Sequence, residues 1–145
     1  MSYELYIKGE PIAKKRPRFA RRGNFVATIN DQETEEGRFL FEVQKQWGLP
    51  PLNSYLSIEM FFCFTIPKSA SKKKSHQMEV GEILPTKKDL DNCIEFVLDC
   101  LNGETWKDDS LITRIVANKF YGRDPFTKII IVNLGKNENA LSHIS

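Results

Sequence analysis

The chain has 145 residues, with 21 Lys and Arg against 19 Asp and Glu and a formal net charge of +2. This length suits one domain, and a hydrophobic content of 41% excludes a wholly disordered chain. No apolar run is long enough to cross a membrane, the N-terminus lacks the pattern of a signal peptide, and the three cysteines lack zinc-site spacing. We therefore expect a soluble, cytoplasmic protein without membrane association or a disulfide framework.

The first third of the chain contains three predicted elements. Alternating apolar residues predict strands over 3–8 and 24–29, the second of which could belong to a hairpin. A helix is predicted over 31–47, with acidic residues in its first turns. Asn30 or Asp31 can cap the start of this helix.

The middle of the chain begins with the clearest strand, an aromatic-rich run over 55–66. The segment that follows, about 68–86, has few large apolar residues, so we expect a mobile basic loop. A helix is predicted over 89–102, where Gly103 ends it.

Two further strands, over 111–121 and 128–134, complete the predicted fold. We expect one small α+β domain over 1–135, in which two main helices pack on a mixed or antiparallel β-sheet. The remaining residues, 136–145, are predicted to form a flexible tail.

Positive charge is concentrated in two segments that contain no acidic residue. They read KKRPRFARR over 14–22 and KSASKKK over 68–74. Like charges at this density favour a polyanion such as nucleic acid, although a solvated loop is the simpler alternative. The residues expected to contact DNA are Lys14, Lys15, Arg16, Arg18, Arg21, Arg22, Lys72, Lys73, Lys74 and Lys87.

Carboxylates gather around the second helix, where the chain reads KKDLDNCIEFVLDCLNGETWKDDSLI. Asp89 and Asp91 occupy the predicted N-cap and first turn, so helix capping alone could explain them. Capping does not explain Asp108 and Asp109. Because Mg²⁺ combines one or two carboxylates with substrate phosphates, acids beside basic segments indicate a metal site.

Two geometric questions stay open at this point. The helix is about 20 Å long, and the segment after Gly103 is too short to return along it. Asp109 therefore reaches Asp89 only if the next strand turns back early, or if a second subunit brings the two sites together. Phe96 and Cys100 widen the apolar arc of the helix, which indicates either a subunit interface or a helix held between the sheet and a loop.

The motifs DLDN, FVLDCLNG and KDDSLI, with the opening GEPIAKKRPRF, resemble the RusA family of Holliday-junction resolvases. The resemblance implies a homodimeric crossover junction endodeoxyribonuclease of DNA recombination and repair, common in prophages. Such an enzyme uses Mg²⁺, or Mn²⁺ in its place, to make paired symmetric nicks in four-way DNA junctions. It also implies metal ligands at Asp89, Asp91 and Asp109, with Asp108 as a helper.

One position departs from the family pattern. Many members have Lys four residues after the second Asp of DxDN, where this chain has Glu95. Either Glu95 joins the metal ligands or another cation replaces the Lys, and an exposed acid without a role is the simple alternative. Lys87, Lys88 and Lys107 are candidates for that cation, and Lys88 is placed with Glu95 among the catalytic residues.

The other notable side chains have ordinary explanations. His76 and His143 lie in polar segments, the cysteines are expected to be small buried hydrophobes, and Trp106 is expected to pack rather than to stack on a base. A second function is a non-catalytic protein that binds branched or single-stranded nucleic acid through a degenerate active site. A third is a structural protein whose acids are helix caps.

Overall fold

The computed structural model describes residues 1–15, 18–22, 25–29 and 32–136. The elements in chain order are β1 (Ser2–Lys8), β2 (Arg18–Arg22), β3 (Phe25–Ile29), α1 (Glu33–Gln46), β4 (Tyr55–Thr65), α2 (Lys72–Glu79), α3 (Leu90–Leu101), the short 3-10 helix η1 (Asp109–Leu111), β5 (Ile112–Gly122) and β6 (Phe126–Gly135). This is one small α+β domain, as the sequence predicts.

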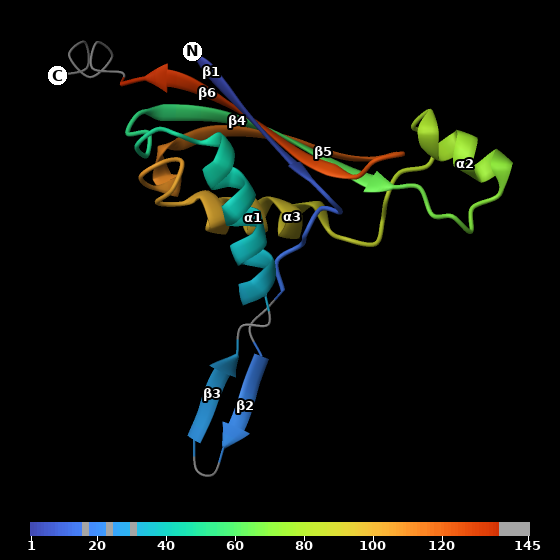
Figure 1. Ribbon diagram of the computed structural model, residues 1–145, viewed down its shortest axis with the longest axis horizontal. Helices are drawn as coiled ribbons and strands as arrows, with labels where there is room; N and C mark the ends of the chain where they lie inside the picture. The colour runs from blue at the N-terminus through green and yellow to red at the C-terminus, as the bar shows by residue number, and fades with distance from the viewer. Residues whose placement is uncertain (16–17, 23–24, 30–31, 137–145) are drawn as a thin grey trace.

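The main sheet has four strands in the order β1-β6-β4-β5. The β4–β5 pair is parallel and the other two pairs are antiparallel, so the sheet is mixed. Helices α1 and α3 cover one face of it, and α2 lies beyond one end (Figure 1). The hairpin formed by β2 and β3 is a separate two-stranded sheet, and Figure 1 shows that it extends away from the rest of the domain.

The core lies between the sheet and these two helices. The side chains of strand β4 at 56, 58, 60, 62 and 64 are all buried and face this core. Phe96 of α3 meets Phe39 of α1 edge to face, with ring centroids 5.4 Å apart. Cys100 is also buried and lines a hollow with α1 residues. The wide apolar arc of α3 is therefore explained by a helix held between the sheet and α1.

The predicted loop over about 68–86 is wrong for its centre, because residues 72–79 form α2. The Ser71 hydroxyl caps this helix by accepting a hydrogen bond from the Lys74 backbone N–H at 3.2 Å. An ion pair of 3.6 Å between Glu79 and Arg123 ties its other end to the chain after β5. Lys72, Lys73 and Lys74 therefore lie on a helix. The sequence did not reveal this helix because the segment lacks apolar periodicity.

Part of the basic run after residue 14 is also a regular element, since Arg18–Arg22 is a strand paired with β3. The predicted strand over 24–29 is confirmed as the other half of this hairpin. The predicted caps Asn30 and Asp31 lie outside the described residues, and α1 begins after Gln32, whose side chain makes no capping bond.

Across the described ranges, no helix is both long and apolar enough to span a membrane. All three cysteines are free and buried, as expected. The predicted tail lies outside the described residues beyond Lys136.

Candidate active site at the start of helix α3

Asp89 and Asp91 lie together at the N-terminal end of α3. Asp89 is the N-cap residue by backbone position, with φ −70° and ψ 136°, yet its side chain makes no capping hydrogen bond. Asp91 lies in the first turn, and both residues are exposed. Capping therefore does not account for Asp89, although the helix dipole favours both negative charges. Their carboxylates face solvent at a point where N–H groups also attract phosphate.

Two lysine side chains extend to the same helix end. The Lys119 ammonium, from β5, donates a hydrogen bond of 2.6 Å to the backbone carbonyl of Lys88. The Lys88 ammonium in turn donates to the Pro11 carbonyl at 2.5 Å. Lys88, which precedes Asp89, therefore joins the start of α3 to the loop after β1.

The thiol of Cys93 reports the balance of charge at this end. Burial raises its pKa, and the negative charges of Asp89 and Asp91 add to that rise. The ammonium groups of Lys88 and Lys119 oppose it. All four charged groups thus act on one buried atom of α3, which places them around its first turns.

The start of the basic segment docks on the same helix. The Lys14 backbone N–H donates to the Asn92 carbonyl at 2.8 Å, and its ammonium pairs with Asp99 at 2.5 Å. The hydrogen bond to Asp99 raises the pKa of Lys14. The chain therefore leaves the side of α3 just before it enters the β2–β3 hairpin.

Gln32, the N-cap residue of α1, holds the segment that leads into this hairpin. Its buried side chain accepts from the Lys15 backbone N–H at 2.6 Å and donates to the Ala13 carbonyl at 2.8 Å. Sequence reasoning missed this residue. A polar side chain at a helix start gave no signal that it would bind backbone 17 residues earlier.

The second acidic pair begins η1, where its two members do different work. Asp108 is the N-cap of η1, and its carboxylate accepts a hydrogen bond of 3.1 Å from the Ser110 backbone N–H. Hydrogen bonding to the Ser110 side chain, and then to this backbone N–H, lowers the pKa of Asp108. Asp109 instead accepts from the indole N–H of Trp106 at 2.7 Å. Trp106 is completely buried, which confirms that it packs.

Asp109 lies toward the far end of α3. It lines a shallow hollow with Leu98 and with Ile112, Thr113, Arg114 and Ile115 of β5. Leu98 follows Asp91 by seven residues, or about 10 Å along a helix. Within the described ranges, no three His, Cys, Asp or Glu side chains gather as a metal site. Asp109 is therefore placed beside Leu98, whereas Asp89 and Asp91 lie at the start of α3.

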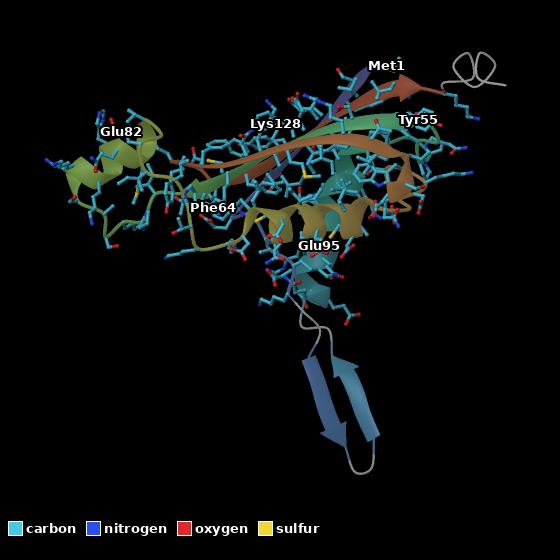
Figure 2. All side chains as sticks on the ribbon, turned by 180° about the vertical axis from the view of Figure 1, so that it is seen from behind. Met1, Tyr55, Phe64, Glu82, Glu95 and Lys128 are labelled. Carbon is cyan, nitrogen blue, oxygen red and sulfur yellow. The ribbon has the colours of Figure 1, made fainter. Side chains whose placement is uncertain are left out.

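The other predicted residues lie around this centre. Glu95 is exposed on α3 (Figure 2). Lys87 and Lys107 are exposed, and His76 is exposed on α2. Among the described residues, the exposed lysines of the basic segments are Lys15, Lys68 and, on α2, Lys72, Lys73 and Lys74. Side chains of Arg16, Arg18, Arg21 and Arg22, and all of His143, lie outside the described residues.

Comparisons with known proteins bear on the same region. Residues 8–132 match the family model described as Endodeoxyribonuclease RusA. A protein of Bacillus subtilis (strain 168), named Uncharacterized protein YqaN, is 30% identical over 130 residues. That alignment covers 86% of this chain and 92% of the relative. The family match, over residues 8–132, includes both acidic pairs and both basic segments.

Proposed function

This chain belongs to the RusA endodeoxyribonuclease family, and on that premise we propose that it is a Mg²⁺-dependent enzyme that resolves four-way DNA junctions by paired symmetric nicks. Membership supports a Holliday-junction resolvase role, and it implies endonuclease activity on junctions. Nucleases of this family generally depend on a divalent metal. The choice of Mg²⁺, the paired nicks, and a role in recombination and repair are the proposal.

The observation that carries the proposal is the uncommitted carboxylate of Asp89 beside Asp91. A capping carboxylate would be bound to helix N–H groups, whereas this one is exposed and makes no capping bond. Mg²⁺ takes hard oxygen ligands and commonly binds one or two carboxylates together with substrate phosphate. The pair therefore fits a divalent cation that is completed by DNA and by one more ligand.

Asp89, Asp91 and Asp109 would hold the metal. A bound divalent cation neutralises the charge that develops on the cleaved phosphate and activates the attacking water. The chain's own contribution is to hold these carboxylates in place. The Trp106 indole N–H serves this purpose at Asp109, because it fixes one carboxylate oxygen and leaves the other to bind.

The basic segments supply the DNA contacts in this proposal. Lys14 and Lys15 leave the side of α3, and β2 of the hairpin that follows carries three arginines of the motif, Arg18, Arg21 and Arg22. The three exposed lysines of α2 lie at the end of the sheet (Figure 1). Two separate positive surfaces suit a branched substrate whose arms diverge.

We further propose that the enzyme is a homodimer in which Asp109 comes from the partner subunit. Leu90, Ile94 and Leu98 recur one turn apart on α3 and are only partly buried. A two-fold axis at Ile94 would set Leu90 of one chain against Leu98 of the other. Since Asp109 lies beside Leu98, that arrangement carries it to the Asp89–Asp91 end of the partner helix.

Mixed dimers test this shared site. Asp91→Asn and Asp109→Asn are each expected to be inactive alone, whereas a mixture should regain nicking of one strand. In such a heterodimer one site receives both intact residues and the other site receives neither. A mixture as inactive as its parents, with subunit exchange verified by mass, would place the whole site within one chain.

A cleavage assay tests the function itself. The protein is incubated with a synthetic four-way junction or a linear duplex of the same sequence, with and without Mg²⁺. Symmetric paired nicks in the junction alone, and only with Mg²⁺, are expected. The second candidate, a non-catalytic binder, is favoured by Glu95 at the family's Lys position. It predicts salt-sensitive junction binding without nicks in Mg²⁺ or Mn²⁺.

A further inference from the structure

Lys119 lies where a lysine is difficult to accommodate. In β5 it pairs with Phe62 of β4, between Ala117 and Tyr121, both of which pack on the core. These positions share the sheet face that α3 covers. A charged side chain on such a face is costly unless its ammonium reaches water or a partner.

The ammonium of Lys119 reaches the peptide that precedes Asp89, at the N-terminal end of α3. The helix dipole disfavours a cation there, whereas the negative charges of Asp89 and Asp91 favour one. The Lys88 ammonium binds the Pro11 carbonyl, so it is already engaged by the backbone. A neutral donor could make the same bond to the Lys88 carbonyl, and a charged residue used in its place is a candidate for function.

The position of the hydrogen bond between Lys119 and Lys88 indicates where the charge of Lys119 acts. The Lys88 carbonyl that Lys119 binds at 2.6 Å belongs to the peptide that leads directly into Asp89. One of the three ammonium protons is used in that bond, and two stay free. The side chain is half-buried, so its charge is less screened than one on an open surface.

We propose that Lys119 is a catalytic cation that binds the scissile phosphate at the Asp89–Asp91 site. This inference rests on the proposed nuclease function and deepens it. In this chain the charge comes from strand β5, across from a helix that carries Glu95. The role requires the charge of Lys119 and not merely its hydrogen bond to Lys88.

The test separates charge from structure with two variants. Lys119→Met removes both the charge and the donor, whereas Lys119→Gln removes the charge and keeps a donor. Both are expected to lower the single-turnover cleavage rate of a four-way junction in Mg²⁺ by about 100-fold, as for loss of one charge-stabilising donor. Lys128→Met is the matched control, since Lys128 is also a half-buried strand lysine but lies on the other face of the sheet (Figure 2).

A second readout does not depend on activity. The affinity for Mn²⁺ alone, measured by calorimetry, should stay the same or rise a few-fold in both variants, because a repelling charge has been removed. A merely structural role would displace Asp89 and lower that affinity. The double variant Lys119→Met with Glu95→Lys places a cation on the helix instead. We expect its cleavage rate to be at least about tenfold higher than that of Lys119→Met alone.

The outcomes also separate this inference from the function on which it rests. Wild-type protein that never nicks a junction overturns the proposed function. Wild-type cleavage with Lys119→Gln within about threefold of it overturns the role of Lys119 alone. A Mn²⁺ affinity that falls in step with the rate overturns it as well, because Lys119 would then only hold the start of α3.

Discussion

The two acidic pairs, Asp89–Asp91 and Asp108–Asp109, each stand at a helix start, and they use their carboxylates differently. Asp108 spends its carboxylate on a backbone N–H of η1, as a capping residue does. Asp89 has the same N-cap position on α3 and makes no such bond. Identical residues in equivalent local positions can therefore be structural in one place and available for ligands in the other.

The difference follows from what surrounds each pair. Around Asp89 and Asp91 stand two lysines and the docked basic segment, so positive groups and phosphate-seeking residues converge there. Around Asp108 the helix has a single turn, and the neighbouring Asp109 is held by a buried indole. The hydrogen bond to Ser110 gives Asp108 a capping role, and we propose ligand roles for Asp89, Asp91 and Asp109.

The largest effect is expected at the α3 pair. Asp91→Asn removes one ligand charge, and we expect the junction cleavage rate to fall by about 10³-fold, equivalent to several kcal/mol of transition-state stabilisation. Junction binding in Ca²⁺ should be kept, since a negative charge near the phosphates has been removed. Asp124→Asn, an exposed acid in the turn before β6, is the control. A variant that cuts at the normal rate would remove Asp91 from the site.

The second pair allows an internal comparison between adjacent residues. Asp109→Asn keeps an oxygen for the Trp106 indole but loses the charge, so the cleavage rate is expected to fall by about 100-fold with the fold intact. Asp108→Asn should leave the rate within about threefold, because Asn caps a helix as well as Asp does. Equal losses in the two variants would end the distinction between capping and ligand carboxylates.

Gln32 tests how firmly the basic hairpin is anchored beside α3. Gln32→Ala leaves the Lys15 N–H and the Ala13 carbonyl without their partner in a buried place, so we expect a loss of about 1–3 kcal/mol in the free energy of unfolding. Gln46→Ala is the matched control. Gln46 makes the same two bonds, to the Tyr6 N–H and carbonyl, but it is exposed. Urea denaturation should show a clearly smaller loss for Gln46→Ala.

Much of this architecture could be predicted from the sequence. The strand at β4 and the helix at α3 are confirmed nearly to their ends, because apolar period, aromatic content and flanking Pro or Gly agree there. Helix α2 was not predicted, since KKKSHQME has no apolar stripe. The Ser71 cap is a local signal that was missed, whereas the Arg123 contact is tertiary and leaves no local pattern.

The candidate site, like the fold, could be predicted from the sequence only in part. The DLDN motif locates Asp89 and Asp91 at a helix start, and the helical period places both in its first turns. Lys119 lies about 30 residues away on another element, in a strand whose pattern gives no sign of a functional lysine. Only the register of β5 on β4 brings it over α3. Residues that join a site through sheet register are those that sequence reasoning misses.

The smallest expected effect is on the pH dependence of stability, and it compares variants of two α3 cysteines. Cys93 lies near the start of the helix and Cys100 near its end. Burial raises the pKa of Cys100 to about 12, whereas Lys88 and Lys119 partly offset the rise at Cys93. Between about pH 9 and 12 folded Cys100 keeps its proton while the unfolded thiol loses it. The unfolded state then binds fewer protons, so stability falls as pH rises, by about 1.4 kcal/mol per pH unit.

Cys100→Ala should flatten this slope in urea denaturation between pH 9 and 10, and Cys93→Ala should flatten it less. Parallel curves for the wild type and Cys100→Ala would mean that the far end of α3 is as open to water as its start.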